Sequence, residues 1–536
     1  MWDTTCLWYP LEYKVMRRFL WYLRRFLPFG LVVLLAVSVL SSLNSLNEKG
    51  NLTTIPSRTL AARAQGTDSV FVTRAGTSLL LNGQPFRFAG ANIYWLGLEE
   101  VNTGNGIAYP SQFQVDDALA TAQVMGATVV RSHTLGISVG CSICVEPTLG
   151  SFNQVALQHI DYAIQSAHTH GIRLIIPLVD NWHFYHGGKH TFTDWRGISD
   201  ENQFYTNPQV ISDFEQYVSV LLNHVNTYTG IAYKNDPTIM TWELGNELSA
   251  PASWVQLMAN YIKSIDLQHL VMDGNYEQAD ETTNFLPDLS IPAIDMYTGH
   301  YYPPTASTFL KEAQQAYAAN KVFVVGEFDW NIFTPTVINN FLKLIQNSTA
   351  SGDLYWSLFP HADTYGFVYR KEHYTLHYPG DTADMRIRVN MLRQHAFAMQ
   401  NTPAPVVTLT GTPVITFASS SGIAWRGTAG ADTYSIERAT VGATGPWTVI
   451  CNRCVTDTTG RWLDASRPQG NVWYRMRAFS AWGSPSGYSN VYHPAIAKPV
   501  KRSSCTITGS RCSWSYATQE TKHVAIRLRY QAVSRL

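Results

Sequence analysis

Short apolar runs alternate with amphipathic stretches over residues 70–400. Stretches such as 152–171 and 210–228 place an apolar residue every three or four positions, which is typical of a helix with one buried face. Gly171 predicts the end of the first of these helices. The apolar runs predict eight buried strands, at Phe86–Ile93, Thr128–His133, Arg173–Val179, Ile239–Leu244, His269–Asp273, Ile294–Tyr297, Lys321–Gly326 and Leu354–Leu358.

Strands that alternate with helices in this way predict an α/β fold, a (β/α)8 TIM barrel over residues 70–400. A doubly wound open sheet is the competing architecture, but no glycine-rich phosphate loop follows the first strand. In a barrel, the carboxyl ends of all strands meet on one face. Polar residues at the strand ends are therefore the candidates for a functional site.

The pattern changes at Pro403 and Pro405. Residues 405–493 are rich in Thr, Ser and Gly, and their short alternating runs recur at roughly ten-residue spacing. The pattern predicts a small all-β sandwich over residues 401–494. Several of its positions resemble a fibronectin type III module: Trp425, Tyr434, Trp447, Tyr474, Ala478 and Ser489-Asn490.

The two ends of the chain differ from its body in charge. Basic and acidic residues number 39 each, but residues 1–25 carry a net charge of +3 and residues 495–536 one of +7, which leaves −10 for the body. The basic residues 1–25 precede an uncharged apolar run at 26–43, the pattern of an export signal or a membrane anchor. We expect the rest of the chain to lie outside the cytoplasm, after a polar linker at 44–69. The tail at 495–536 has no clear periodicity, and we expect it to be disordered.

Composition narrows the class of ligand. A zero net charge with only 15% charged residues argues against a nucleic-acid binder. The 16 Trp, 28 Tyr and 23 Phe suit stacking on flat, uncharged ligands such as sugars.

The seven cysteines include two C-x-x-C pairs, which lie too far apart for one shared zinc site. We expect each pair to close a local disulfide in an exported chain, Cys141 with Cys144 and Cys451 with Cys454. Cys505 and Cys512 are candidates for a third disulfide, which leaves Cys6 unpaired.

The predicted strand ends carry two carboxylates among aromatic, amide and cationic side chains. Glycoside hydrolysis needs such a pair, because one acid protonates the leaving oxygen while the other attacks or stabilises the sugar carbon. The strand-end residues are Asn92, Trp95, Arg131, His133, Asn181, Trp182, His183, Asn246, Glu247, His300, Tyr302, Glu327 and Trp356.

These motifs resemble glycoside hydrolase family 5, and within it the β-mannanase-like and cellulase-like members. The combination of Asn-Glu after the fourth strand with Glu after the seventh is the most specific part of the resemblance. The motifs that carry it are GANIYWL (90–96), VVRSHTLG (129–136), WELGNE (242–247), HYYP (300–303), VVGEFDW (324–330) and YWSL (355–358).

The resemblance implies that Glu247 is the general acid/base and Glu327 the nucleophile. Because the family is retaining, it implies carboxylates about 5–5.5 Å apart. It also implies that Arg131 keeps Glu327 ionised and that Tyr302 donates a hydrogen bond to Glu327. We expect Glu243, deeper in its strand, to be a buried structural acid.

The other expected contacts with substrate surround this pair. The resemblance implies that Asn246 bonds the sugar 2-hydroxyl, that His300 positions the acid/base or the sugar, and that Trp356 forms the floor of the glycone subsite. Three more strand-end residues complete the predicted substrate-binding set: Trp95, Asn181 and His183.

The sequence thus predicts a retaining, endo-acting β-glycosidase for a β-1,4-linked polysaccharide, with mannan first and no cofactor or metal. We expect a monomer that binds no nucleic acid. Departures from the mannanase pattern at Ser132-His133, Leu248 and Asp329 leave a β-1,4-glucanase open.

Two rival functions come from other classes. One is a metal-dependent hydrolase that uses His183, His186 and His190, and the other is a carbohydrate-binding protein without catalysis.

Overall fold

The computed structural model describes residues 70–101, 106–275, 289–370 and 372–494, and the short strands β19 (Ile507–Thr508) and β20 (Arg511–Cys512). The predictions for residues 1–69, for Cys6 and Cys505, and for the order of the tail lie outside the described residues. Within the described ranges, no helix has both the length and the apolar character needed to cross a membrane.

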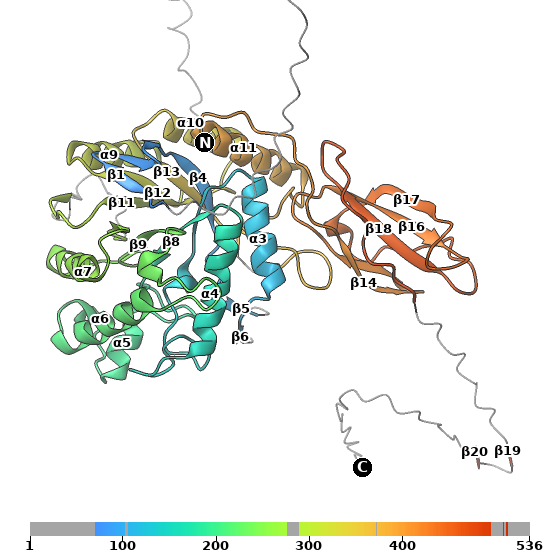
Figure 1. Cartoon of the computed structure of the whole chain (residues 1–536), viewed down its shortest axis with the longest axis horizontal. Coiled ribbons are helices and arrows are strands. Elements are labelled where there is room, and N and C mark those ends of the chain that lie inside the picture. Colours follow the sequence, from blue (N-terminus) through green and yellow to red (C-terminus); the bar gives the residue numbers. More distant parts are fainter. Residues whose placement is uncertain are drawn as a thin grey trace, which may run out of the picture. The chain divides into compact units, whose positions relative to one another are not determined.

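Eight parallel strands close into a barrel, which confirms the predicted (β/α)8 architecture (Figure 1). Each predicted strand corresponds to one barrel strand. In barrel order they are β4 (Phe88–Asn92), β7 (Val129–Arg131), β8 (Arg173–Pro177), β9 (Ile239–Glu243), β10 (Leu270–Met272), β11 (Met296–Tyr301), β12 (Val322–Asp329) and β13 (Gly352–Trp356).

Helices follow the strands along the chain and surround the barrel (Figure 1). The α-helices are α3 (Gln112–Val124), α4 (Gln154–Thr169), α5 (Lys189–Trp195), α6 (Pro208–Asn223), α7 (Ala252–Ile265), α9 (Ala306–Ala318), α10 (Pro335–Gln346) and α11 (Ala383–Met399). Short 3-10 helices are η1 (His133–Leu135), η2 (Glu201–Tyr205), η3 (Tyr233–Asn235) and η4 (Asp457–Thr459).

Local sequence explains where the two predicted helices begin and end. The Asn153 side chain caps α4 by accepting hydrogen bonds from two backbone N–H groups, and Asn207 caps α6 in the same way before Pro208. Gly171 adopts φ 67° just after α4, which confirms its predicted role as a helix stop.

One end of the barrel is filled with apolar side chains, and a small antiparallel sheet packs beside them. That sheet contains β1 (Thr73–Ala75), β2 (Ser78–Leu81) and β3 (Gln84–Pro85), and Leu79 of β2 belongs to the same apolar cluster as the barrel residues. Phe88 and Val129 contribute to this cluster from the first positions of their strands, and Leu354 contributes from the middle of β13. The opposite end is thereby left to the polar strand ends.

The twofold alternation of a strand explains why polar groups appear at that opposite end. Residues two or four positions after a lumen residue share its face of the strand, so Asn92 follows Phe88, Arg131 follows Val129 and Trp356 follows Leu354. The same faces that fill the barrel with apolar groups therefore present site residues where the strands end.

Strand β12 reaches the site through a register shift. Val324 belongs to the cluster inside the barrel, so regular alternation would turn Gly326 inward and Glu327 outward. The pairing with β11 passes directly from Gly299–Val325 to His300–Glu327, which leaves Gly326 without a partner. A Cβ atom on Gly326 would lie 2.1 Å from Thr298 Oγ1. This glycine bulge brings Glu327 into the cavity with its neighbours.

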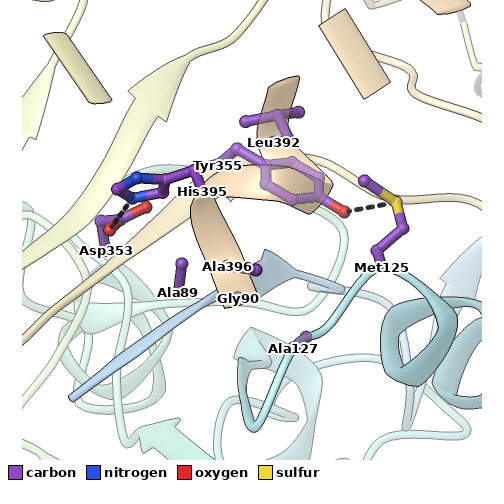
Figure 2. Close-up of a pocket in the computed structure, with 9 residues that line it drawn as sticks. All are labelled: Ala89, Gly90, Met125, Ala127, Asp353, Tyr355, Leu392, His395 and Ala396. Carbon is purple, nitrogen blue, oxygen red and sulfur yellow. Dashed lines mark hydrogen bonds and ion pairs between the residues drawn. The ribbon is translucent and has the colours of Figure 1, made fainter. Parts of the chain in front are cut away.

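Helix α11 packs on the outside of the barrel against β13 and β4. Figure 2 shows His395 of α11 directed toward Asp353 of β13, and His395 Nε2 lies 2.7 Å from Asp353 Oδ2. The Tyr355 hydroxyl donates to Met125 Sδ at 3.4 Å in the same region (Figure 2). Ala89, Leu392 and Ala396 line the small cavity between them, of about 10 Å³.

The carboxyl-terminal part of the described chain forms antiparallel sheets that share one apolar core. One sheet pairs β14 (Val414–Ser419) with β15 (Gly422–Arg426), and the other orders β17 (Thr448–Val455), β16 (Thr433–Ala439) and β18 (Trp473–Phe479). This arrangement agrees with the predicted all-β domain. The expected disulfides Cys141–Cys144 and Cys451–Cys454 are both present.

Candidate active site

Two carboxylates, Glu247 after β9 and Glu327 in β12, lie at the carboxyl end of the barrel. One oxygen of each lies within 4.8 Å of the other and of a His300 ring nitrogen. Retaining glycosidases hold their two carboxyl groups about 5–5.5 Å apart, whereas inverting ones need about 6.5–9.5 Å to admit a water molecule. The spacing therefore suits direct attack on the sugar by one of the two acids.

Arg131 organises the buried side of the site. Its guanidinium is fully buried, donates to both oxygens of Glu243 at 2.6 and 2.9 Å, and donates from Nη1 to Glu327 Oε1 at 2.7 Å. Burial alone would lower the pKa of Arg131, but Glu243 and Glu327 outweigh it and raise that pKa. Glu243 is a buried structural acid, as predicted.

Tyr302 and His300 contact the two carboxylates from β11 and the loop after it. The Tyr302 hydroxyl donates to Glu327 Oε2 at 2.8 Å, and His300 Nδ1 lies 2.8 Å from Glu247 Oε1. Burial would lower the pKa of His300, but Glu327 and Glu247 outweigh it and raise that pKa above the usual value. The imidazolium form is thus favoured between the two acids.

Glu247 has an unusual backbone conformation. Its φ of 53° lies in the left-handed region, which costs a residue with a Cβ atom about 1–2 kcal/mol. The turn aims its carboxylate at His300 and at Trp182, whose indole Nε1 donates to Glu247 Oε2 at 2.5 Å. Local strain at this position is offset by the contacts that orient the acid.

A cavity of about 480 Å³ opens onto the two carboxylates. Tyr94 and Trp356 stack in it with ring centroids 4.9 Å apart and an interplanar angle of 5°. The apolar ring faces can support a sugar, while the carboxylates reach its bonds. The remaining lining residues are Glu100, His133, Trp182, Phe184, Tyr185, His186, Asn246, Tyr302, Glu372 and Tyr374.

The structure brings most of the predicted residues to this cavity but not all of them. Trp95 is 1% exposed, bonds the Leu358 carbonyl and packs in the core, so Tyr94 takes the place predicted for it. Asn181 does not line the cavity, although its backbone N–H donates to the Asn246 carbonyl.

His183 also lies outside the cavity lining. Its side chain is 60% exposed, pairs with Glu201 at 2.9 Å and stacks on His190. The prediction placed it on the substrate because it closely follows a strand, but the loop turns it toward solvent.

Several lining residues were missed by the sequence reasoning. Tyr94 carried a signal, since it is an aromatic residue close after a barrel strand, and Trp182 was named at a strand end but not included in the predicted substrate-binding set. Glu372 and Tyr374 carried none, because they come late in the loop after β13, where no periodicity fixes their direction.

The three histidines of the rival metal-dependent hydrolase do not converge, because His186 turns to Asp180 while His183 and His190 stack on each other. Among the described residues, two other groups bring three donor atoms within 4.8 Å of one another, His133–Asp180–His186 and Glu247–His300–Glu327. Both lie at the cavity, and both are already held together by hydrogen bonds to protein groups.

Comparisons with known proteins place this geometry in context. A family model described as GH family 5 beta-mannosidase-like matches residues 69–327, which include both carboxylates. Mannan endo-1,4-beta-mannosidase 7 of Arabidopsis thaliana is 30% identical over 368 residues, 56% of this chain and 83% of that protein. Mannan endo-1,4-beta-mannosidase 3 of the same plant is 32% identical over 263 residues, 44% of this chain and 61% of that protein.

A solved structure extends the likeness to three dimensions. The hyperthermostable endo-1,4-beta-D-mannanase from Thermotoga petrophila shares 26% sequence identity and a TM-score of 0.51, over 58% of this chain and 99% of that one. The likeness therefore covers essentially the whole of that protein and the barrel-sized part of this one.

Proposed function

The chain belongs to glycoside hydrolase family 5, in its β-mannosidase-like group, and from this premise we propose that it is a retaining endo-1,4-β-mannanase. The observation that carries the proposal is the close pair Glu247–Glu327, held by Arg131, Tyr302 and His300 at the mouth of an aromatic cavity. The substrate is a neutral β-1,4-linked polysaccharide, and the reaction needs no cofactor.

The proposed reaction is a double displacement in two steps. Glu327 attacks the anomeric carbon, because Arg131 and Tyr302 each donate to one of its oxygens and hold its side chain at the cavity. Glu247 protonates the leaving oxygen and then takes a proton from the water that hydrolyses the glycosyl–enzyme. The Trp182 indole N–H donates to Glu247 Oε2 and helps to orient this side chain.

Mannan is the proposed polysaccharide because the relatives that match along most of the barrel are named for its internal hydrolysis. The Tyr94–Trp356 stack supplies an apolar surface for a pyranose, and Asn246 lies in the cavity beside Glu247 for the sugar 2-hydroxyl. Glucan and mannan differ in the configuration at that carbon, so Asn246 is the residue best placed to distinguish them.

The test is reducing-sugar release from mannan, glucomannan, carboxymethylcellulose and xylan, with wild type, Glu327→Ala and Glu327→Gln side by side. We expect fastest release from mannan, products longer than two sugars early in the reaction, and no turnover by either variant. A matched control is Glu201→Ala, an acid in η2 outside the cavity, which should retain full activity. Activity confined to glucan would overturn the substrate, and full activity of Glu327→Ala would overturn the mechanism.

For the carboxyl-terminal sheets we propose a fibronectin type III-like module that acts as a spacer. Of the aromatic residues that carry the resemblance, Trp425, Tyr434 and Tyr474 are at most 2% exposed and so cannot stack on a sugar, and Trp447 is partly buried. The test is retention of the whole protein on insoluble mannan after Trp482→Ala and Tyr488→Ala, two exposed aromatic residues of this part. Unchanged retention is expected, and a clear loss would favour a polysaccharide-binding module.

We also propose that residues 26–43 direct export or anchor the chain, so that a monomeric barrel acts outside the cytoplasm. The uncharged run after a basic segment supports this proposal. Cell fractionation with protease protection tests it, and barrel fragments that stay cytoplasmic and protected would overturn it.

A further inference from the structure

Asp180, in the loop after β8, is a fully buried acid that the proposed mechanism leaves without a role. Its Oδ1 accepts hydrogen bonds from Asn246 Nδ2 at 3.2 Å and from the Trp182 backbone N–H at 2.9 Å. Its Oδ2 lies 2.8 Å from His186 Nε2. The buried Asp180 carboxylate, with its three donors, thus connects the cavity wall to Asn246, the residue before the acid/base.

These bonds determine which way round the Asn246 amide lies. Arg131 can only donate, so the oxygen of Asn246 faces Arg131 Nη2 at 2.9 Å. The Asp180 carboxylate accepts, so the nitrogen faces Asp180. One N–H and one oxygen lone pair of the amide remain for a ligand in the cavity. The amide cannot flip and exchange the positions of these two groups.

His186 and His133 complete the wall around Asp180. His186 is 2% exposed and lines the cavity, and with Nε2 donating to Asp180 its Nδ1 has no partner among the described residues. His133 accepts from Arg131 at Nε2, so its ring proton is on Nδ1, 3.9 Å from Asp180 Oδ2. Burial and the nearby Arg131 lower the pKa of His133, which keeps this ring neutral.

We infer that Asp180 and His186 are positioning residues, which hold the Asn246 amide in the orientation that binds the 2-hydroxyl of the sugar at the cleavage point. The inference rests on the proposed function. In glycosidases, hydrogen bonds to that hydroxyl strengthen in the transition state, so the direction of the amide bears on kcat as well as on binding. Loss of the pair leaves the amide held by Arg131 alone, without the acceptor that fixes its nitrogen, and the penalty falls on substrates that carry the 2-hydroxyl.

The experiment compares an aryl β-mannobioside with its analogue that lacks the 2-hydroxyl on the sugar attached to the aryl group. We expect Asp180→Ala to lower kcat/KM about 10- to 100-fold on the first substrate and less than about threefold on the second. We expect His186→Ala to show the same pattern with a smaller ratio. His186→Gln should recover part of the loss, because its amide N–H can again donate to Asp180.

The matched control is Asp161→Ala. Asp161 of α4 is fully buried and lies 2.9 Å from His224 Nε2, but it is not part of the cavity. Its loss should lower the unfolding midpoint and leave the ratio between the two substrates unchanged. If Asp180→Ala does not fold, the His186 variants decide the matter.

Equal losses on both substrates, or no loss on the 2-hydroxy substrate, would overturn this inference and leave the proposed function standing. A wild-type protein that cleaves neither aryl mannoside nor mannan would overturn the proposed function, and the inference with it.

Discussion

Two buried aspartate–histidine pairs in this barrel have nearly the same geometry and different surroundings. Asp180–His186 spans 2.8 Å at the carboxyl end, and Asp353–His395 spans 2.7 Å between β13 and α11. The first pair contacts Asn246 and the cavity, whereas alanines and a leucine line the space at the second (Figure 2). The comparison teaches that distance and burial do not distinguish a functional pair from a structural one. The direction of the remaining polar atoms does.

The largest expected effect comes from removing Glu247, the acid that follows Asn246, which the first pair contacts. We expect Glu247→Ala to lower kcat on mannan by about 10²–10⁴-fold, the usual contribution of a general acid/base. Hydrolysis of a substrate with an activated aryl leaving group should suffer less in the first step, because that group needs no proton. Steady-state kinetics on both substrates, with and without azide, checks this.

The accompanying control is Asp353→Ala, which should keep wild-type kcat on both substrates. An azide adduct of inverted configuration from Glu247→Ala would contradict the retaining geometry, since azide should displace Glu327 from the opposite face of the sugar, where the Glu247 side chain was removed, and give net retention.

A third buried histidine, His361, lies between two acids and not beside one. His361 Nδ1 lies 2.8 Å from Asp117 Oδ2 and its Nε2 lies 3.2 Å from Asp457 Oδ2. Burial would lower the pKa of His361, but the two aspartates outweigh it and raise that pKa to about 10. A raised histidine pKa stabilises the fold fully below its unfolded value of about 6.5, and that stabilisation is lost as the pH rises toward 10.

We therefore expect the free energy of unfolding to fall between pH 7 and pH 10, by at most about 1.4 kcal/mol per pH unit from this group. Urea unfolding at several pH values measures the slope. His361→Gln should flatten it, and an unchanged slope in that variant would exclude His361 as the cause.

Breaking the second pair should affect stability alone. Asp353→Ala leaves a buried ring N–H of His395 without an acceptor, which costs about 1–3 kcal/mol of unfolding free energy. Asp353→Asn, which keeps an acceptor oxygen, should cost less. Urea unfolding measures the loss, and a tenfold fall in kcat/KM of the folded Asp353→Ala protein would break the distinction between the two pairs.

The smallest expected effect concerns Trp182. Trp182→Phe keeps an aromatic face in the cavity and removes only the N–H that bonds Glu247, and the ring is 42% exposed. We expect kcat/KM on mannan to fall about threefold to tenfold. A hydrogen bond to a charged group is worth about 1.5–3 kcal/mol when buried and less when solvated. Trp182→Ala, which also removes the face, should lose more than Trp182→Phe. Equal losses would assign the effect to stacking alone.

Much of the fold could be predicted because barrel strands are buried on both faces and appear as continuous apolar runs. Their bounds were less accurate, and β12 continues to Asp329, past the predicted end at Gly326. The bulge at Gly326 could not be predicted, because a register shift depends on the neighbouring strand and not on the strand's own pattern.

The residues proposed for catalysis could be predicted more fully than the residues that line the cavity. Glu247, Glu327, Arg131 and Tyr302 follow from strand ends and from the resemblance. Arg131 and Tyr302 donate to Glu327 as expected, and one oxygen of Glu247 lies within 4.8 Å of one of Glu327. Trp95 was predicted in place of its neighbour because two aromatic residues follow the strand and nothing in the sequence shows which one faces the cavity.

The left-handed backbone at Glu247 has a consequence for engineering. Glycine adopts φ 53° without the steric cost that any other side chain incurs there, so Glu247→Gly should unfold at a higher temperature than Glu247→Ala. A library selected for heat resistance alone would therefore enrich Glu247→Gly. That variant is inactive because it lacks the side chain that supplies the proton. Directed evolution of this chain must select for turnover and durability together.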